Sequence, residues 1–168
     1  MKINNEILIL NTGGTFNKYY DPIKGELKVN QNNNFIEDII IKSKIDSVQI
    51  EGILYKDSLE LDDDDRTYLK EYILKTKYKK IIVIHGTDTM DQSAKVISQF
   101  VQDKMVVFTG AMKPFTIESV EAVSNLMSAY GYLSNTFKAG VFISMHGMIK
   151  EHHLIKKNKE LGVFECLN

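Results

Sequence analysis

The feature that most constrains the fold is an alternation of short apolar, β-branched runs with segments of helical periodicity. Residues 80–84 form the most strand-like of these runs, and residues 6–11 open the chain with another. Both are apolar throughout rather than on alternate positions, which is typical of parallel strands covered by helices on both faces. The sequence therefore predicts an α/β fold with an open, mostly parallel sheet of the flavodoxin or Rossmann type.

The same patterns set the expected elements along the chain. The expected strands are residues 6–11, 48–55, 80–84, 105–108 and 141–145, and the expected helices are about 35–44, 61–78, 90–100 and 120–130. Residues 16–34 are rich in Asn, Tyr, Gly and Lys, and we expect a mobile loop long enough to be a lid. The four aspartates at 62–65 fall in a first helical turn, where the helix dipole favours negative charge, so we interpret them as structural.

Composition limits the organisation and the partners. The 168 residues suit a single domain spanning 1–168, and 21 basic against 22 acidic residues give no field that would attract nucleic acid. Cys166 is the lone cysteine, which favours a reducing compartment. The first ten residues carry Lys2 and Glu6, and their apolar run is too short for a signal peptide or a spanning helix. We therefore expect a cytoplasmic protein without a membrane partner.

Three glycine- and threonine-containing turns follow three of the expected strands. They are TGGT at residues 12–15, HGTDTM at 85–90 and TGAM at 109–112. Carboxyl ends of parallel strands meet at one edge of the sheet, where α/β proteins bind ligands. Glycines let the backbone approach a ligand closely, and a threonine hydroxyl can donate, accept or attack. One such turn alone indicates a strand-to-helix connection, but three at one edge favour a pocket for an anion or a carboxylate.

Several other sites are not supported. Gly13–Gly14 lacks the later glycine of the dinucleotide fingerprint, and neither a P-loop nor a serine-hydrolase elbow is present. His152 and His153 are expected to point to opposite sides of an extended segment, so no metal is expected. His85 and His146 are expected to brace backbone rather than transfer protons. Cys166 is given no role.

With the third turn extended to GAMKP at 110–114, the three turns resemble the signature turns of the bacterial-type L-asparaginases. HGTDTM is the most specific of them. The resemblance covers nearly all of the chain, but only the larger, amino-terminal domain of a usual family member; the smaller second domain is missing. It implies an asparaginase N-terminal-domain fold and a cofactor-free amidohydrolase that converts L-asparagine to L-aspartate and ammonia.

The resemblance also implies catalytic residues. Thr15 matches the nucleophile, which attacks the side-chain amide carbon to give an acyl-enzyme that water resolves. Thr87 and Asp88 match a hydrogen-bonded set, completed by a lysine, that helps to deprotonate a nucleophile and binds substrate. Counting on from the last expected strand places this lysine at Lys157, with Lys156 as the neighbouring possibility. A desolvated lysine beside Asp88 is a reasonable activator, although a solvated basic loop remains the alternative.

Substrate contacts carry over in part. Gly14, Gly86 and Ala111 are the matching turn positions, where backbone N–H groups would stabilise an oxyanion. Ser58 matches a residue that holds the α-carboxylate and amine of the substrate. Leu59 departs from the family pattern because an apolar side chain cannot replace the polar contact, and this leaves the identity of the substrate open.

Two further matches are less specific. The family has a catalytic tyrosine on its flexible first loop, and here Tyr19 and Tyr20 are the tyrosines in that stretch. Tyr20 receives a slight preference beside Asp21, while either ring could be ordinary lid surface. Glu121 matches an acidic residue near the subunit contact or pocket rim, and we expect it to have a structural role in its helix.

The leading hypothesis is thus an L-asparaginase-type amidohydrolase acting on asparagine or a related amino acid. The alternative is a non-catalytic amino-acid-binding or regulatory module on the same fold. An amidotransferase component is a third possibility, which lacks an obvious tRNA-binding appendage. A lone domain without its companion is expected to cover the exposed face with a second copy, so we expect a homodimer or a larger homo-oligomer.

Overall fold

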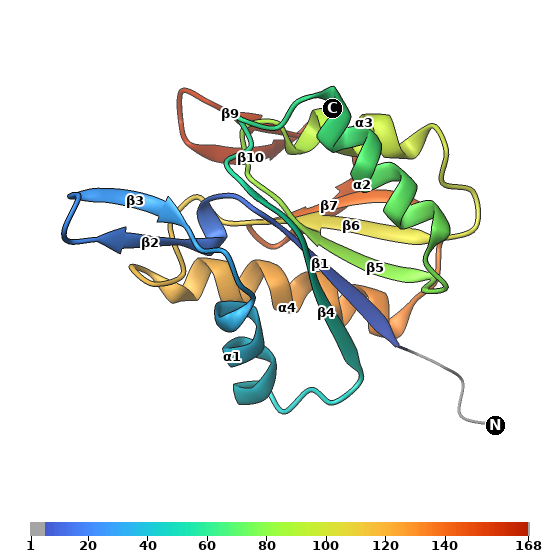
Figure 1. The fold of residues 1–168 in the computed structure, drawn as a ribbon. Helices are drawn as coiled ribbons and strands as arrows, with labels where there is room; N and C mark the ends of the chain where they lie inside the picture. The colour runs from blue at the N-terminus through green and yellow to red at the C-terminus, as the bar shows by residue number, and fades with distance from the viewer. Residues whose placement is uncertain (1–5, 168) are drawn as a thin grey trace.

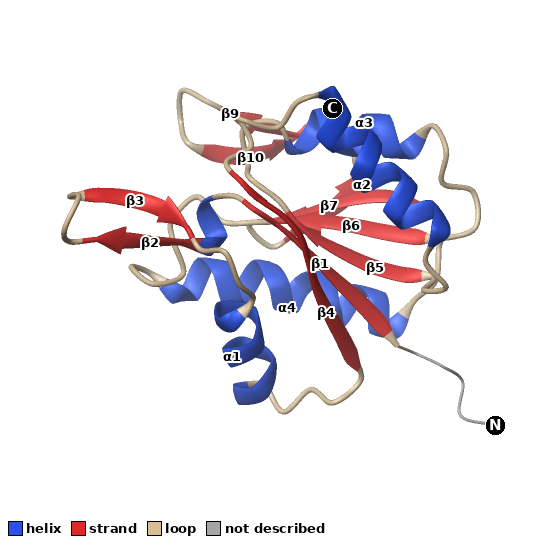
Figure 2. Ribbon diagram, viewed as in Figure 1, coloured by secondary structure: helices blue, strands red, loops and turns tan. Residues whose placement is uncertain are grey.

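The computed structural model describes residues 6–167 as a three-layer α/β structure (Figures 1 and 2). Residues 1–5, on which part of the expectation about a leader falls, lie outside the described residues. The main sheet runs in the order β4-β1-β5-β6-β7-β8. Its strands are β1 (Ile7–Gly13), β4 (Val48–Lys56), β5 (Lys80–Ile84), β6 (Met105–Thr109), β7 (Gly140–Met145) and β8 (Met148–Glu151).

Neighbouring strands of this sheet are parallel from β4 to β7, and β8 is antiparallel to β7. The predicted open, mostly parallel α/β sheet is therefore confirmed. In chain order, the five parallel strands have the arrangement 2-1-3-4-5, which is the flavodoxin-like order.

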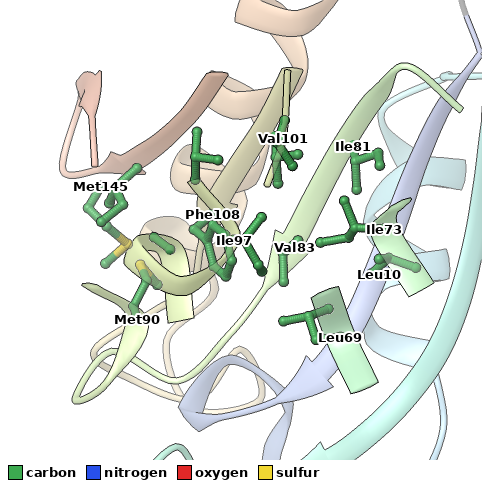
Figure 3. Close-up of a cluster of buried hydrophobic side chains, with 14 of the residues drawn as sticks. Leu10, Leu69, Ile73, Ile81, Val83, Met90, Ile97, Val101, Phe108 and Met145 are labelled. Carbon is green, nitrogen blue, oxygen red and sulfur yellow. The ribbon is translucent and has the colours of Figure 1, made fainter. Parts of the chain in front are cut away.

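Helices cover both faces of the sheet, as the uniformly apolar strands predict. One face carries α2 (Asp63–Lys75) and α3 (Met90–Ser98), and the other carries α1 (Asn34–Lys42) and α4 (Ser119–Asn135). Alternate strand residues feed the two cores: Leu8 and Leu10 pack with α2 and α3, whereas Ile7 and Ile9 pack with α1 and α4. Figure 3 shows the first of these cores.

The expected helix over 61–78 is shorter at both ends. It begins after Asp62, whose carboxylate accepts a hydrogen bond from the Asp65 N–H at 2.9 Å in a capping box. It ends at Lys75, because the backbone is extended at Thr76. The Lys104 ammonium donates hydrogen bonds to the carbonyl oxygens of Thr76 and Tyr78 in the segment that follows. The structural interpretation of the aspartate run is confirmed. No helix of the described residues has the length and apolar character needed to span a membrane.

The prediction of an irregular loop over residues 16–34 is wrong, because the segment has regular secondary structure. The segment forms a 3-10 turn (Thr15–Asn17) and then a hairpin of β2 (Lys18–Asp21) and β3 (Glu26–Val29). The Asp21 carboxylate accepts from the N–H groups of Ile23 and Lys24 and pairs with Lys28, and this closes the hairpin turn. Polar composition hid the hairpin, because a two-stranded ribbon on the surface needs no apolar run.

A second small hairpin was not predicted. β9 (Ile155–Asn158) pairs antiparallel with β10 (Val163–Cys166), and Ile155 and Phe164 are buried in the core beside α3. In Figure 2 this hairpin and β2–β3 lie on the same side of the sheet, beyond the carboxyl ends of its parallel strands. Both hairpins therefore flank the edge where the three turns meet.

Candidate active site

The three turns meet where the strand order reverses. β1 lies between β4 and β5, and the helices that follow β1 and β5 pass to opposite faces of the sheet. This reversal is the switch point at which open α/β sheets bind ligands. The turn after β1 and the turn after β5 lie on its two sides. Both are at the carboxyl edge of the sheet, where the sequence predicts them.

Glycine contacts hold these turns against each other. A Cβ at Gly14 would lie 2.4 Å from the Gly86 nitrogen, and one at Gly86 would lie 2.5 Å from the Ser58 Cβ. At the third turn, a Cβ on Gly110 would lie 2.3 Å from the His85 carbonyl oxygen. Each distance is too short for a Cβ atom, so this close packing requires glycine at all three positions. Gly14 also has a φ of +74°, a conformation that favours glycine.

Three threonine hydroxyls in these turns serve the backbone. Thr12 Oγ1 donates to the Ile84 carbonyl at 2.8 Å, and Thr109 Oγ1 donates to the Ser144 carbonyl at 2.9 Å. Thr89 Oγ1 donates to the Ser58 carbonyl at 2.8 Å. These side chains are buried and join neighbouring strands and loops. They are therefore structural, which leaves the hydroxyls of two other threonines for ligand chemistry.

Those two hydroxyls belong to Thr15 and Thr87. Thr15 is partly exposed, and within residues 6–167 its hydroxyl makes no hydrogen bond. Thr87 is almost buried, and its Oγ1 accepts a hydrogen bond from Lys157 Nζ at 2.9 Å. The Gly14–Gly86 contact brings the two turns together, whereas convergence of the two hydroxyls on one pocket stays a prediction.

Lys157 reaches this edge from β9, 70 positions along the chain from Thr87. Its Nζ also donates to Asp88 Oδ1 at 2.9 Å and forms an ion pair with that carboxylate. The Lys157 side chain is 13% exposed, whereas neighbouring Lys156 is exposed. The structure thus places Lys157, rather than Lys156, beside Thr87 and Asp88.

The remaining expected contact residues lie around this group. Ser58 is buried against Gly86, while Leu59 is 71% exposed. Ala111 is fully buried in the core with α4, so its methyl group packs inside the protein and only its backbone could face a ligand.

The two candidate tyrosines occupy opposite faces of β2. Tyr19 lines a hollow of about 490 Å³ together with Asp57 and Glu60. Tyr20 lies outside that hollow and is more exposed. Of the two rings, Tyr19 is the one that shares a hollow with the loop bearing Ser58. Which of the two tyrosines takes the family role stays a prediction.

An ion pair between Lys18 and Asp57 joins the β2–β3 hairpin to the Ser58 loop, and no pattern in the sequence indicates it. Partial burial raises the pKa of Asp57, but the Lys18 ammonium, the Leu59 N–H and the Lys157 charge outweigh that effect. The pKa of Asp57 is therefore below its usual value, and the carboxylate is ionised at neutral pH.

His85 is a neutral brace beneath the second turn. Nδ1 lies 2.8 Å from the Gly86 carbonyl oxygen, which can only accept, so Nδ1 carries the proton. Nε2 then accepts from the Ser93 hydroxyl at 2.8 Å. Complete burial lowers the pKa of His85 to about 4. The expectation that this histidine braces the backbone agrees with these contacts.

The expected divergence of His152 and His153 is wrong. Their ring centroids lie 5.4 Å apart, because the two residues occupy a turn between β8 and β9 rather than an extended segment. Across residues 6–167, no group of three or more His, Cys, Asp or Glu side chains could hold a metal ion.

Comparison with known proteins agrees with this geometry. Residues 6–163 match the family model described as asparaginase, N-terminal. An L-asparaginase of Thermococcus kodakarensis is 25% identical over 174 residues, covering 97% of this chain and 51% of the relative. A glutaminase-asparaginase of Acinetobacter glutaminasificans is 29% identical over 119 residues, covering 68% of this chain and 35% of the relative. The chain thus spans about half the length, or less, of these relatives.

Solved structures show the same fold. The thermostable L-asparaginase from Thermococcus kodakarensis superposes with a TM-score of 0.82 at 24% identity, over 97% of this chain and 51% of that one. A probable cytoplasmic L-asparaginase from Campylobacter jejuni superposes with a TM-score of 0.79 at 26% identity, over 96% of this chain and 51% of that one.

The glycine contacts generate a first prediction. Gly86→Ala should force the Ser58 loop away from the second turn and lower the free energy of unfolding by about 1–3 kcal/mol. Gly131→Ala is the matched control: nothing lies within 4 Å of that Cβ, and alanine in this helix should stabilise by up to about 1 kcal/mol. Urea unfolding of both variants measures the difference, and equal effects would contradict the close packing.

The neutral state of His85 generates a second prediction. Its folded pKa of about 4 lies below the ordinary histidine value of 6.5, so between these values the unfolded chain binds a proton that the folded chain does not. Stability should therefore fall as the pH drops through this window. From pH 7 to pH 5 this group should cost about 2 kcal/mol. Urea unfolding of wild type and His85→Gln at both pH values tests this, and identical pH dependences would count against it.

Proposed function

Because this chain belongs to the asparaginase family, as an asparaginase N-terminal domain, we propose that it hydrolyses L-asparagine to L-aspartate and ammonia. The observation that carries this proposal is the contact of Lys157 with both Thr87 and Asp88 at the switch point. A cation, a hydroxyl and a carboxylate joined in this way can move a proton during attack on an amide.

Thr15 is the proposed nucleophile. Its oxygen bonds to the side-chain amide carbon of the substrate, and the negative charge on the carbonyl oxygen is stabilised by backbone N–H groups of the glycine turns. The carbon–nitrogen bond then breaks, and the hydroxyl proton of Thr15 leaves on the nitrogen as part of ammonia. Water hydrolyses the resulting ester and returns a proton to Thr15. No cofactor is needed for either half of the reaction.

Thr87, Asp88 and Lys157 are proposed to carry the proton between these steps. Because Lys157 donates to the Thr87 oxygen, the hydroxyl hydrogen of Thr87 is free to point toward a reacting group. Asp88 keeps the ammonium in place, and its side chain is one-third exposed, so it can also meet the α-ammonium group of a substrate. Ser58 is proposed to contact the α-carboxylate, and Tyr19 or Tyr20 to act from the hairpin.

A non-catalytic amino-acid-binding module is the second candidate. It is favoured by the exposed, apolar Leu59 beside Ser58. Such a module would bind the amino acid at the same edge of the sheet without releasing ammonia.

Substitutions at the site separate these candidates. Thr15→Ala and Lys157→Met should each lower ammonia release from asparagine by at least about a hundredfold, because they remove the nucleophile and the proton path. Lys156→Met is the matched control and should retain activity, since that side chain is exposed. Equal ammonia release by wild type and Thr15→Ala would refute the proposed amidohydrolase activity. A rise in Tm with asparagine in that case would favour the binding module.

We also propose that the chain forms a homodimer or a larger homo-oligomer. Ile117 and Val120, before and at the start of α4, are 62% and 70% exposed, and a second copy would cover them. Light scattering should give at least twice the monomer mass, and a monomer at micromolar concentration would contradict this. A cytoplasmic location is proposed as well, and recovery of the chain in a membrane or secreted fraction would exclude it.

A further inference from the structure

His146 occupies a backbone conformation that is unfavourable for histidine. It forms, with Gly147, the two-residue turn between β7 and β8, and the two residues have φ angles of +53° and +78°. Positive φ at both positions is typical of a type I′ hairpin turn, where Asn-Gly is the preferred sequence. A histidine here costs backbone strain, so the contacts of its ring are of interest.

Both ring nitrogens of His146 make hydrogen bonds. Nδ1 lies 3.3 Å from the backbone nitrogen of Phe164 and accepts from its N–H. Nδ1 must then be unprotonated, and the proton on Nε2 is donated to Glu121 Oε1 at 3.0 Å. The ring also meets the Phe164 ring edge to face, with centroids 5.9 Å apart. His146 thus bridges α4 and β10.

Glu121 is itself fixed in place by the third turn. Its Oε1 accepts from the Met112 N–H at 2.9 Å, and its Oε2 accepts from the Lys113 N–H at 3.2 Å. The Glu121 side chain is only 17% exposed. His146 is therefore hydrogen-bonded to a carboxylate that cannot move without breaking its own hydrogen bonds to the turn after β6.

Phe164 lies directly opposite Lys157 in the β9–β10 pair. Leu167 N–H bonds to the Leu154 carbonyl, and the alternation of antiparallel pairs makes Phe164 and Lys157 a non-hydrogen-bonded pair. The Phe164 N–H consequently points away from β9, toward His146. A two-stranded hairpin is marginally stable by itself, so this bond adds a polar anchor to the burial of Ile155 and Phe164.

From these contacts we infer that His146, held by Glu121, is a positioning residue for Lys157. It fixes the strand opposite Lys157, and so keeps the ammonium within hydrogen-bond distance of Thr87 and Asp88. The inference rests on the proposed function for its catalytic consequence, while the positioning itself is independent of any activity.

Two substitutions that are both compatible with the turn test the role of His146 Nδ1 as the acceptor for the Phe164 N–H. His146→Gly and His146→Asn each accept positive φ, but only asparagine keeps an oxygen near the position of Nδ1. His153→Gly is the matched control, since His153 is exposed. The readouts are amide hydrogen exchange at Phe164 relative to Ile82 in β5, NMR signals of the Lys157 ε-methylene protons, and kcat and KM for ammonia release.

His146→Gly should speed exchange at Phe164 about tenfold relative to Ile82. The two Lys157 ε-methylene signals should merge as the ammonium loosens. The kcat should fall about tenfold, with KM changed less than about twofold, because the proton path is displaced rather than substrate binding. His146→Asn should restore all three values to within about twofold, and His153→Gly should leave them unchanged.

Unchanged Phe164 exchange in His146→Gly would overturn the inference, as would faster exchange with unaltered Lys157 signals. An asparagine variant as defective as the glycine variant would also overturn it, because the acceptor would then not be responsible. If wild type releases no more ammonia than Thr15→Ala, the proposed function fails, and the exchange and NMR comparisons still decide the positioning.

Discussion

Close packing at three glycines along one edge of the sheet is the constraint on which the rest of the site depends. Gly14 touches Gly86, Gly86 touches Ser58, and Gly110 touches the His85 carbonyl, each at a distance that admits no side chain. Three loops from different parts of the chain can share one small volume only because these positions lack a Cβ. The same contacts explain why the turns, rather than the strands, carry the recognisable sequence patterns.

The glycine contacts bring together only the first half of the site. The lysine comes from β9, which belongs to a separate two-stranded hairpin beyond the end of the sheet. Its placement depends on the burial of Ile155 and Phe164 and on the bridge from α4 through His146. The turns at the sheet edge are thus held by close packing at glycines, whereas the β9–β10 hairpin is held to the rest of the protein by side-chain contacts. Changes in this hairpin can therefore move Lys157 relative to Thr87 and Asp88 without disturbing the turns.

The sequence patterns predicted the five parallel strands well, but they did not predict the antiparallel β8 or the two surface hairpins. The strand over Lys80–Ile84 is apolar throughout because helices cover both its faces, and its bounds could be predicted to the residue. β9 contains Lys156 and Lys157 between a buried Ile155 and a polar Asn158, so its only apolar signal is one residue. The choice of Lys157 came from the family resemblance, since no local pattern separates it from Lys156. The bridging contacts of His146 join residues that are 18 and 25 positions apart and have no sequence pattern.

Threonine content alone could not separate structural hydroxyls from those available to a ligand. The hydroxyls of Thr12, Thr89 and Thr109 each donate a hydrogen bond to a backbone carbonyl of a neighbouring strand or loop. They are therefore not available to a ligand. Thr87 differs because a lysine donates to its oxygen and leaves its hydrogen free. Thr15 differs because it is partly exposed and its hydroxyl makes no hydrogen bond among the described residues. Whether a threonine hydroxyl is structural or open to a ligand therefore depends on which backbone carbonyl groups lie near it in the folded sheet edge. This distinction exists only once β1 has paired with β5, β6 has paired with β7 and the Ser58 loop has packed against the second turn.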